Sequence, residues 1–200
     1  MLYYENKFKA QGFDVIIGVD EAGRGPLAGP VVAGAVSLLS AHFENRIDDS
    51  KKLTSREREN AFPEIKEKSV FGIGIVDEKT IDRVNILVAT HLAMEQAVAA
   101  LIEKIKNPDK KRIHLLIDGD IRLKTGLPSL AIIKGDGKSK SIACASIIAK
   151  VTRDRIMSEY DKVYPQYGFI RHKGYPTKMH KLAIKKFGLS GIHRKSFNSA

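Results

Sequence analysis

An apolar strand followed directly by two carboxylates is the feature of this sequence that most restricts its fold. Residues 15–19 read Val-Ile-Ile-Gly-Val, a β-branched run typical of a buried strand, and Asp20 and Glu21 come next. Two adjacent carboxylates repel each other, and an ordinary hairpin has no need for such a pair at the end of a buried strand. Because a bound cation would relieve this repulsion, we expect a metal site at the end of the strand.

The segment after the carboxylates is rich in glycine. Gly23 and Gly25 carry no Cβ and let the backbone approach a ligand closely, and Arg24 between them supplies a guanidinium group suited to phosphate. The same residues fit a dinucleotide-binding pattern, which is the alternative interpretation. That pattern has to open a helix, whereas residues 30–36 are β-branched and predict a second strand.

Two later apolar strands, residues 113–117 and 130–133, also lead to carboxylates. If they lie parallel to the first strand in an α/β sheet, their carboxyl ends share one edge with it. Each later aspartate also has a local explanation, as a turn residue or as a helix N-cap, so the argument depends on all of them together. The side chains expected to converge at this edge are those of Asp20, Glu21, Asp118 and Asp136.

The other elements follow from periodicity and capping. Residues 14–19, 30–39 and 69–76 predict three strands, the last two paired in a meander, and helices are expected from Thr54 and over 86–105, 141–151 and 177–187. Thr54 and Glu57 form a capping box. The helix at 141–151 is apolar on nearly every side, so we expect it to be buried, with Cys144 as a core residue rather than a nucleophile.

The composition of the chain indicates which class of molecule it binds. The 200 residues carry a net charge of +11, which favours a polyanion, and a hydrophobic content of 43% suits one domain with a core. From Thr152 onward, basic and aromatic residues alternate, as suits phosphates and bases, although a solvated helical cap would show this too. A single cysteine excludes a disulfide framework. Since neither a signal peptide nor a membrane span is evident, we expect a cytoplasmic protein.

Four clustered carboxylates predict hard divalent cations. Oxygen ligands suit Mg²⁺ or Mn²⁺, and two such ions about 4 Å apart activate water and stabilise the leaving oxygen of a phosphodiester. Together with a basic surface this predicts a two-metal nuclease. Two alternatives remain open, namely a non-catalytic nucleic-acid binder with a structural ion, and a phosphotransferase that uses the glycine-rich segment to hold a nucleotide.

Six segments of the sequence resemble bacterial ribonuclease HII: residues 18–31, 49–53, 134–136, 145–151, 172–178 and 192–197. The first, GVDEAGRGPLAGPV, is highly specific, and its Gly-Arg-Gly-Pro form separates it from ribonuclease HIII. The resemblance implies a ribonuclease H-like α/β fold, a mixed five-stranded sheet flanked by helices, with a C-terminal helical extension. We expect a single domain over residues 1–200, with a core over about 12–155 and a basic extension over about 156–200.

The resemblance also implies an activity. It predicts a metal-dependent endoribonuclease that cuts the RNA strand of RNA–DNA hybrids and the phosphodiester 5′ of single ribonucleotides embedded in duplex DNA, leaving a 3′-hydroxyl and a 5′-phosphate. Two Mn²⁺ or Mg²⁺ ions are the implied cofactors. The implied catalytic and metal-binding residues are Asp20, Glu21, Asp118 and Asp136. The expected substrate-binding residues are Gly23, Arg24, Gly25, Lys51, Ser139, Lys140, Lys173 and Tyr175.

Within that substrate set, the resemblance implies distinct roles. Gly23, Arg24 and Gly25 correspond to the loop that reads the ribose 2′-hydroxyl, and Tyr175 corresponds to the tyrosine that senses the junction. Gly137 stands where the family often has serine, so a neighbouring residue, Lys138, Ser139 or Lys140, is expected to supply the phosphate contact. The expected partners are nucleic acids, not a membrane. We expect a monomer without a sliding-clamp peptide at residues 198–200.

Overall fold

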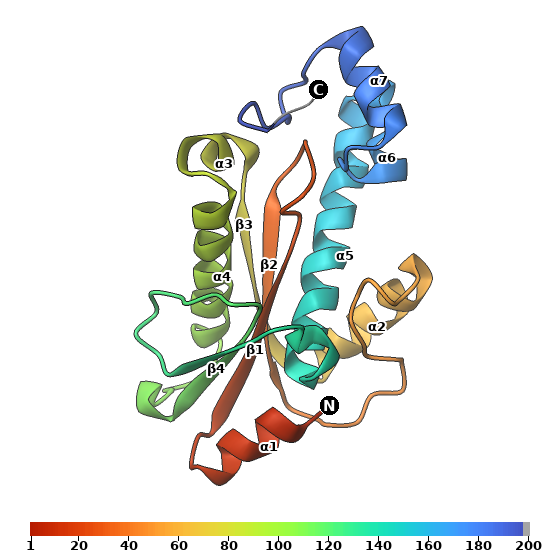
Figure 1. The fold of residues 1–200 in the computed structure, drawn as a ribbon. Coiled ribbons are helices and arrows are strands. Elements are labelled where there is room, and N and C mark those ends of the chain that lie inside the picture. The colour runs from red at the N-terminus through yellow and green to blue at the C-terminus, as the bar shows by residue number, and fades with distance from the viewer. Residues whose placement is uncertain (198–200) are drawn as a thin grey trace.

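The computed structural model describes residues 1–197 and is organised around one five-stranded sheet (Figure 1). The strands are β1 (Val15–Ala22), β2 (Val31–Leu38), β3 (Ser69–Val76), β4 (Ile113–Asp118) and β5 (Ser129–Ile132), in the order β3-β2-β1-β4-β5. Strand β2 is antiparallel to β1 and β3, whereas β4 is parallel to β1 and β5. This mixed sheet confirms the predicted fold class and the meander of its first three strands.

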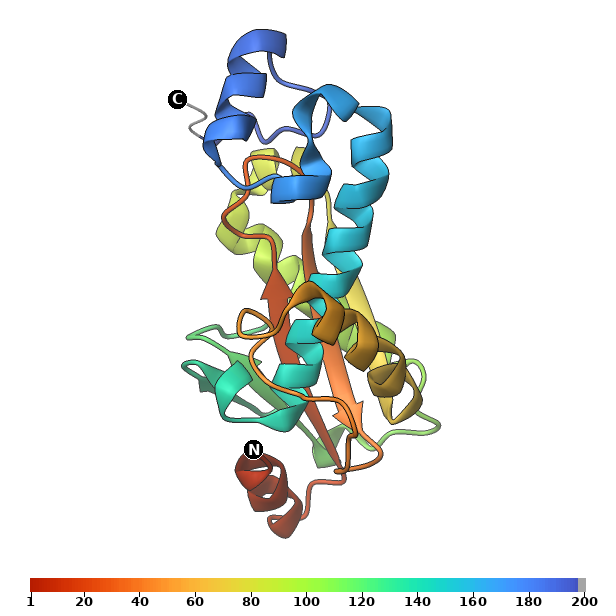
Figure 2. The ribbon, with the colours of Figure 1, turned by 90° about the vertical axis from the view of Figure 1, so that its right-hand side faces the viewer.

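Helices cover both faces of the sheet. They are α1 (Tyr3–Ala10), α2 (Ser55–Glu67), α3 (Glu78–Val84), α4 (Ile86–Ile102), α5 (Lys140–Val163), α6 (Phe169–His172) and α7 (Lys178–Phe187). Helix α4 packs on β2 and β3, and α5 packs on β1 and β2 from the other side, with α2 beside it (Figures 1 and 2). Helices α6 and α7 lie beyond the β1–β2 turn, and α1 lies at the opposite end of the molecule. Three-residue 3₁₀ turns occur at Lys110–Arg112, Gly135–Gly137 and Pro165–Tyr167.

Strand β1 is longer than the apolar pattern predicts. It continues through Glu21 and Ala22, because these residues pair with Ala33 and Val32 of β2. The first two carboxylates therefore lie within the last residues of a strand rather than after it. Their backbone is fixed by the antiparallel ladder, which a short hydrophobic pattern does not encode.

The helix boundaries also differ in places. Helix α4 ends at Ile102 instead of residue 105, α5 continues to Val163 instead of residue 151, and α1 and α3 are not in the prediction at all. Helix α1 is short and polar, and it is held by tertiary contacts, such as the stacking of Phe8 on His114. Such helices depend on packing more than on periodicity, so a sequence pattern misses them.

Several local predictions are confirmed. Helix α2 begins with the complete capping box between Thr54 and Glu57, and α7 begins after the N-cap Thr177. Cys144 lies fully buried in the core, where burial raises the pKa of its thiol. Helix α5 passes residue 155 without a break, so the core and the extension share one helix. Within residues 1–197, no helix combines the length and hydropathy that a membrane crossing requires. The expectation for residues 198–200 lies outside the described residues.

Helix α5 approaches the sheet closely enough to take part in the site at its edge. A Cβ at Gly18 would overlap the backbone of Ser141, so a side chain at this position of β1 would push the helix away. With this close packing, Ser146 of the helix lines the same pocket as Asp20. The fold thus places a polar helix residue beside the first carboxylate.

Candidate active site at the carboxyl edge of the sheet

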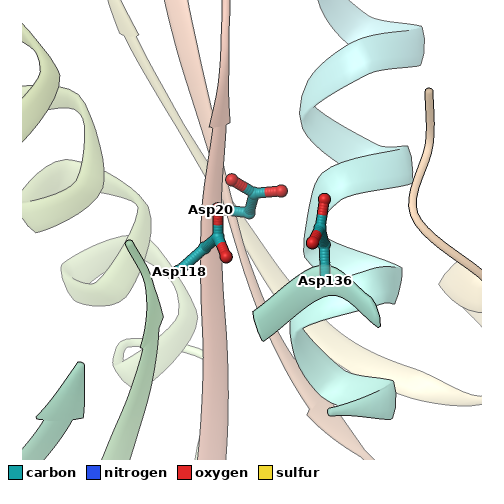
Figure 3. A group of neighbouring side chains, drawn as sticks. All are labelled: Asp20, Asp118 and Asp136. Atoms are coloured by element: carbon teal, nitrogen blue, oxygen red, sulfur yellow. The ribbon is translucent and has the colours of Figure 1, made fainter. Parts of the chain in front are cut away.

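Three aspartates meet at the carboxyl edge of the parallel strands (Figure 3). Asp20 comes from β1, Asp118 from the last position of β4, and Asp136 from the 3₁₀ turn that follows β5. One carboxylate oxygen from each lies within 4.8 Å of the other two. The structure therefore brings together three of the four carboxylates expected at this edge, for the topological reason given by the parallel strands.

Backbone amides hold each of these carboxylates in place. The N–H of the following residue donates to Asp20 Oδ1 at 2.7 Å and to Asp136 Oδ1 at 2.9 Å. Asp118 Oδ1 accepts from the N–H of Gly135 at 2.6 Å. These bonds fix the side-chain orientations without neutralising the charges, so the group is arranged for a ligand that brings positive charge.

Burial disfavours the charged forms of the carboxylates in this group. Asp20 is only 3% exposed, and its pKa is raised well above the usual value, first by burial and then by the charges of Glu21 and Asp118. The pKa of Asp136 is also raised by burial and by Asp118. Carboxylate oxygens crowded in this way fit a hard divalent cation, because such an ion offsets both the desolvation and the repulsion.

We expect Asp20→Asn to stabilise the metal-free protein at neutral pH, by about 1 kcal/mol. The raised pKa means that the folded state binds the proton of Asp20 more tightly than the unfolded state does. Metal-free wild type therefore loses stability as the pH rises from the unfolded pKa of Asp20 through the folded one, and the variant lacks this contribution. Thermal unfolding in chelator at neutral and acid pH measures the difference, which should shrink below about pH 4. If the Asn variant is no more stable than wild type at neutral pH, other groups of the protein must offset the cost of burying the negative charge of Asp20.

Glu21 lies apart from the three-aspartate group. Consecutive residues of a strand point to opposite faces, so its side chain leaves β1 away from that of Asp20. Its carboxylate ion-pairs with Arg24 at 3.4 Å. Burial raises the pKa of Glu21, Arg24 opposes this, and the charge of Asp118 raises it further. Glu21 therefore remains close enough to Asp118 for the two charges to interact.

A pocket opens beside the aspartates and contains most of the predicted substrate-binding residues. Its lining consists of Asp20, Glu21, Ala22, Gly23, Arg24, Gly25, Ser50, Lys51, Asp118, Ser146, Lys150 and Tyr175. The Tyr175 side chain is 41% exposed, and its ring centre lies 5.8 Å from the Lys150 ammonium. The glycine-rich loop and this aromatic ring thus face one space, next to the carboxylates.

Lys51 stands at the carboxylates as predicted for a basic residue near the site. Its ammonium lies 3.5 Å from Asp136 Oδ2 and 3.9 Å from Asp49 Oδ1, and its side chain is 79% exposed. Partial burial lowers the pKa of Lys51, but the charges of Asp136, Asp20 and Asp49 raise it overall. The residue is therefore charged, near the aspartates and free to turn toward a phosphate.

Three other predicted contacts are engaged elsewhere. Ser139 is fully buried, and its hydroxyl donates to Glu5 at 2.6 Å and caps helix α5, so the expectation of a phosphate contact by this side chain is wrong. The Lys140 ammonium donates to the carbonyl of Ala41 at 3.1 Å. The Lys173 ammonium donates to the Ser158 hydroxyl at 3.0 Å. Both lysines would have to give up these bonds to reach a substrate.

The predicted site residues did not include four residues of the pocket, Ala22, Ser50, Ser146 and Lys150. Ser146 and Lys150 lie four positions apart on α5, so both face the same side of the helix. Ser146 shares a hydrogen bond of 2.8 Å with Ser50, and Lys150 donates to Asp154 at 2.7 Å. Polar residues at helical spacing in an otherwise apolar helix were the available signal.

Arg153 belongs to the basic and aromatic stretch that begins at Thr152, which was expected to suit phosphates and bases. Arg153 is fully enclosed, and its guanidinium donates to three backbone carbonyls, so it is not available to phosphates. A basic residue in a basic stretch looks solvated in the sequence. Only its surroundings reveal that it faces the interior.

Comparisons with known proteins agree with this geometry. Residues 17–200 match the family model described as ribonuclease HII. Two curated relatives carry the same name: one from Ruminiclostridium cellulolyticum is 53% identical over 98% of this chain and 75% of its own length, and one from Acetivibrio thermocellus is 54% identical over the same shares. The crystal structure of the ribonuclease H2 from Pyrococcus horikoshii is similar, with a TM-score of 0.71 and 30% identity, over 93% of this chain and 95% of that one.

Proposed function

Because this chain belongs to the ribonuclease HII family, we propose that it cuts the RNA strand of RNA–DNA hybrids and the phosphodiester 5′ of single ribonucleotides embedded in duplex DNA. The chain is a metal-dependent endoribonuclease, and nucleic acid is its substrate. The observation that carries the finer proposal is one pocket in which the carboxylates, the glycine-rich loop and Tyr175 face a common space. We also propose a monomer as the active form.

The carboxylates are the proposed catalytic and metal-binding residues. Asp20, Asp118 and Asp136 would together hold one divalent ion, Mn²⁺ or Mg²⁺, and Glu21 with Asp118 would serve a second. When bound, such ions activate water and stabilise charge at the scissile phosphate. Water attacks the phosphorus and the bond to the 3′ oxygen breaks, which leaves a 3′-hydroxyl and a 5′-phosphate.

The side chains of the protein contribute by orienting the phosphate of the substrate. Lys51 and Lys150 flank the pocket with positive charge, which attracts the backbone of a nucleic acid. Arg24 presents its half-exposed guanidinium at the mouth of the pocket and is tethered by Glu21. These contacts position the strand but carry no sequence information, so we expect cleavage to be independent of base sequence.

The glycine-rich loop is proposed to recognise the sugar. A Cβ at Gly25 would meet only an atom of the Tyr175 ring, at 3.8 Å, so the space above this residue is open toward the pocket. A Cβ at Gly23 would instead overlap the buried Arg153, and the residue has a φ of +104°. Gly25 is therefore the position at which substrate contact, rather than folding, explains the absence of a side chain.

The decisive experiment is incubation with a DNA duplex that carries one embedded ribonucleotide. We expect a single cut on the 5′ side of that ribonucleotide with Mn²⁺ or Mg²⁺, and no cut with chelator. An all-DNA duplex of the same sequence is the control and should stay intact. A protein that binds both duplexes without cutting would be a non-catalytic binder, and phosphate transfer to or from free nucleotide would indicate a phosphotransferase.

A further inference from the structure

Two arginines are buried behind the glycine-rich loop, and their guanidinium groups bond to backbone carbonyls. Arg153 is 0% exposed and Arg194 is 1% exposed, and burial lowers the pKa of the first to about 10 and of the second to about 9. Burying a guanidinium is costly unless its donors are satisfied. In both residues, backbone carbonyls accept hydrogen bonds from the guanidinium. Because burying a guanidinium in this way is costly, we expect it to serve a function.

The carbonyls bonded to Arg194 belong to the glycine-rich loop. Its guanidinium donates to the carbonyl of Gly23 at 2.6 Å, to that of Arg24 at 3.0 Å and to that of Gly29 at 2.9 Å. Its own N–H donates to the carbonyl of Leu27 at 2.9 Å. One residue near the end of the chain therefore holds most of the loop that follows β1.

Arg153 connects this loop with the segment that carries Tyr175. It donates to the carbonyls of Ala28 and Pro30 at 3.1 and 3.0 Å, and to that of Lys173 at 3.0 Å. The glycine-rich loop and the Tyr175 segment are thus both hydrogen-bonded to one buried side chain. A direct hydrogen bond from the N–H of Leu27 to the carbonyl of Gly174, at 2.8 Å, also joins the loop to the Tyr175 segment.

The orientation of the loop's amide groups follows from these bonds. In a trans peptide the C=O and the next N–H point in opposite directions, and residues 1–197 contain no cis peptide. Because the carbonyls of Gly23 and Arg24 turn inward to Arg194, the N–H groups of Arg24 and Gly25 turn outward. Both residues line the pocket, and neither N–H has an acceptor within the described part of the chain.

We propose that Arg194 is a positioning residue, which turns two peptide groups so that the N–H groups of Arg24 and Gly25 face the pocket as a pair of donors for an oxygen of the ribonucleotide. This inference rests on the proposed function and assigns its ribose recognition to a residue outside the pocket. The guanidinium also adds positive charge behind both peptides, which strengthens the outward donors. Arg194 does not touch the substrate itself.

The test is the preference of Arg194→Lys for a ribonucleotide. Lysine keeps the charge, but its ammonium lacks the planar fork that bonds several carbonyls at once. Binding in chelator, where nothing is cut, is measured by fluorescence anisotropy with two duplexes, one all-DNA and one with a single ribonucleotide. We expect the ratio of their dissociation constants to fall roughly tenfold in the variant, as the loss of one or two hydrogen bonds predicts, while affinity for the all-DNA duplex is unchanged.

The matched control is Leu101→Ala, which removes buried volume on α4, in a helix that contributes nothing to the pocket. It should lower the melting temperature but keep the wild-type preference. A wild-type protein without any preference would overturn the proposed ribose recognition. A clear wild-type preference that Arg194→Lys retains would leave that recognition standing and overturn the role of Arg194.

A second measurement covers the case in which Arg194→Lys does not fold. In ¹⁵N-labelled wild type, the amide resonances of Arg24 and Gly25 should shift on binding the ribonucleotide duplex and shift less with the all-DNA duplex. Equal shifts with both duplexes would show that these N–H groups do not contact the ribose, and the proposal would fail.

Discussion

Asp118→Asn should lower the rate of cleavage of a duplex with one embedded ribonucleotide by about two orders of magnitude or more. The substitution keeps the size of the side chain and an oxygen that can accept from Gly135. It removes one of the three grouped negative charges that a divalent ion needs. Single-turnover cleavage at saturating Mn²⁺ or Mg²⁺ measures the loss, and duplex binding should persist because repulsion of the phosphates falls.

Asp120→Asn is the matched control for this loss. Asp120 lies two residues further on, is exposed and is not part of the three-aspartate group. Its variant should retain most of the activity, with the same change in net charge. An Asp118→Asn protein that cuts as fast as the Asp120→Asn protein would remove Asp118 from the catalytic site.

Tyr175→Ala should slow cleavage at a single embedded ribonucleotide by roughly tenfold to a hundredfold, the range expected for a lost stacking contact. The half-exposed ring lines the pocket that also contains Asp20 and Asp118. The stacking hypothesis is that a deoxyribose fits against the ring, whereas a 2′-hydroxyl would crowd it. Cleavage of a continuous RNA strand paired with DNA should therefore slow less in this variant than cleavage of the single-ribonucleotide substrate. The values of kcat/KM on the two substrates test this.

Tyr175→Phe distinguishes the contribution of the ring from that of the hydroxyl. It keeps the stacking surface and should lose much less activity than the alanine variant. Tyr3→Ala, which removes an exposed ring on α1 at the far end of the molecule, controls for the loss of an aromatic side chain. Equal losses in the Ala and Phe variants on both substrates would assign Tyr175 to packing or to its hydroxyl, and would end the stacking hypothesis.

The acidic centre was predictable because it depends on local patterns and one topological rule. Each of Asp20, Asp118 and Asp136 comes at the end of an apolar strand or just after it, and parallel strands bring those ends to one edge. Glu21 shows the limit of the rule. Alternation along β1 turns its side chain away from that of Asp20, so it lies outside the three-aspartate group, yet it still lines the same pocket as Asp20 and Asp118.

The basic residues were less predictable, since charge alone does not tell where a side chain points. Ser139 looked available beside Asp136, yet it caps α5 and is covered by Glu5 of a helix that periodicity did not reveal. Lys51 has a similar local setting and does reach the carboxylates. What separates the two residues is packing by segments far away in the chain.

The sequence by itself therefore determined the strands, the main helices, the carboxylates at the sheet edge and the family. These depend on periodicity, capping and short motifs, which act over a few neighbouring residues. The tertiary structure alone decided how the glycine-rich loop is held. Arg194 bonds to Gly23 across 171 positions, and Arg153 joins that loop to the Tyr175 segment. Hydrogen bonds between backbone carbonyls and a distant side chain leave no periodic trace in a sequence, because any residue supplies the carbonyl.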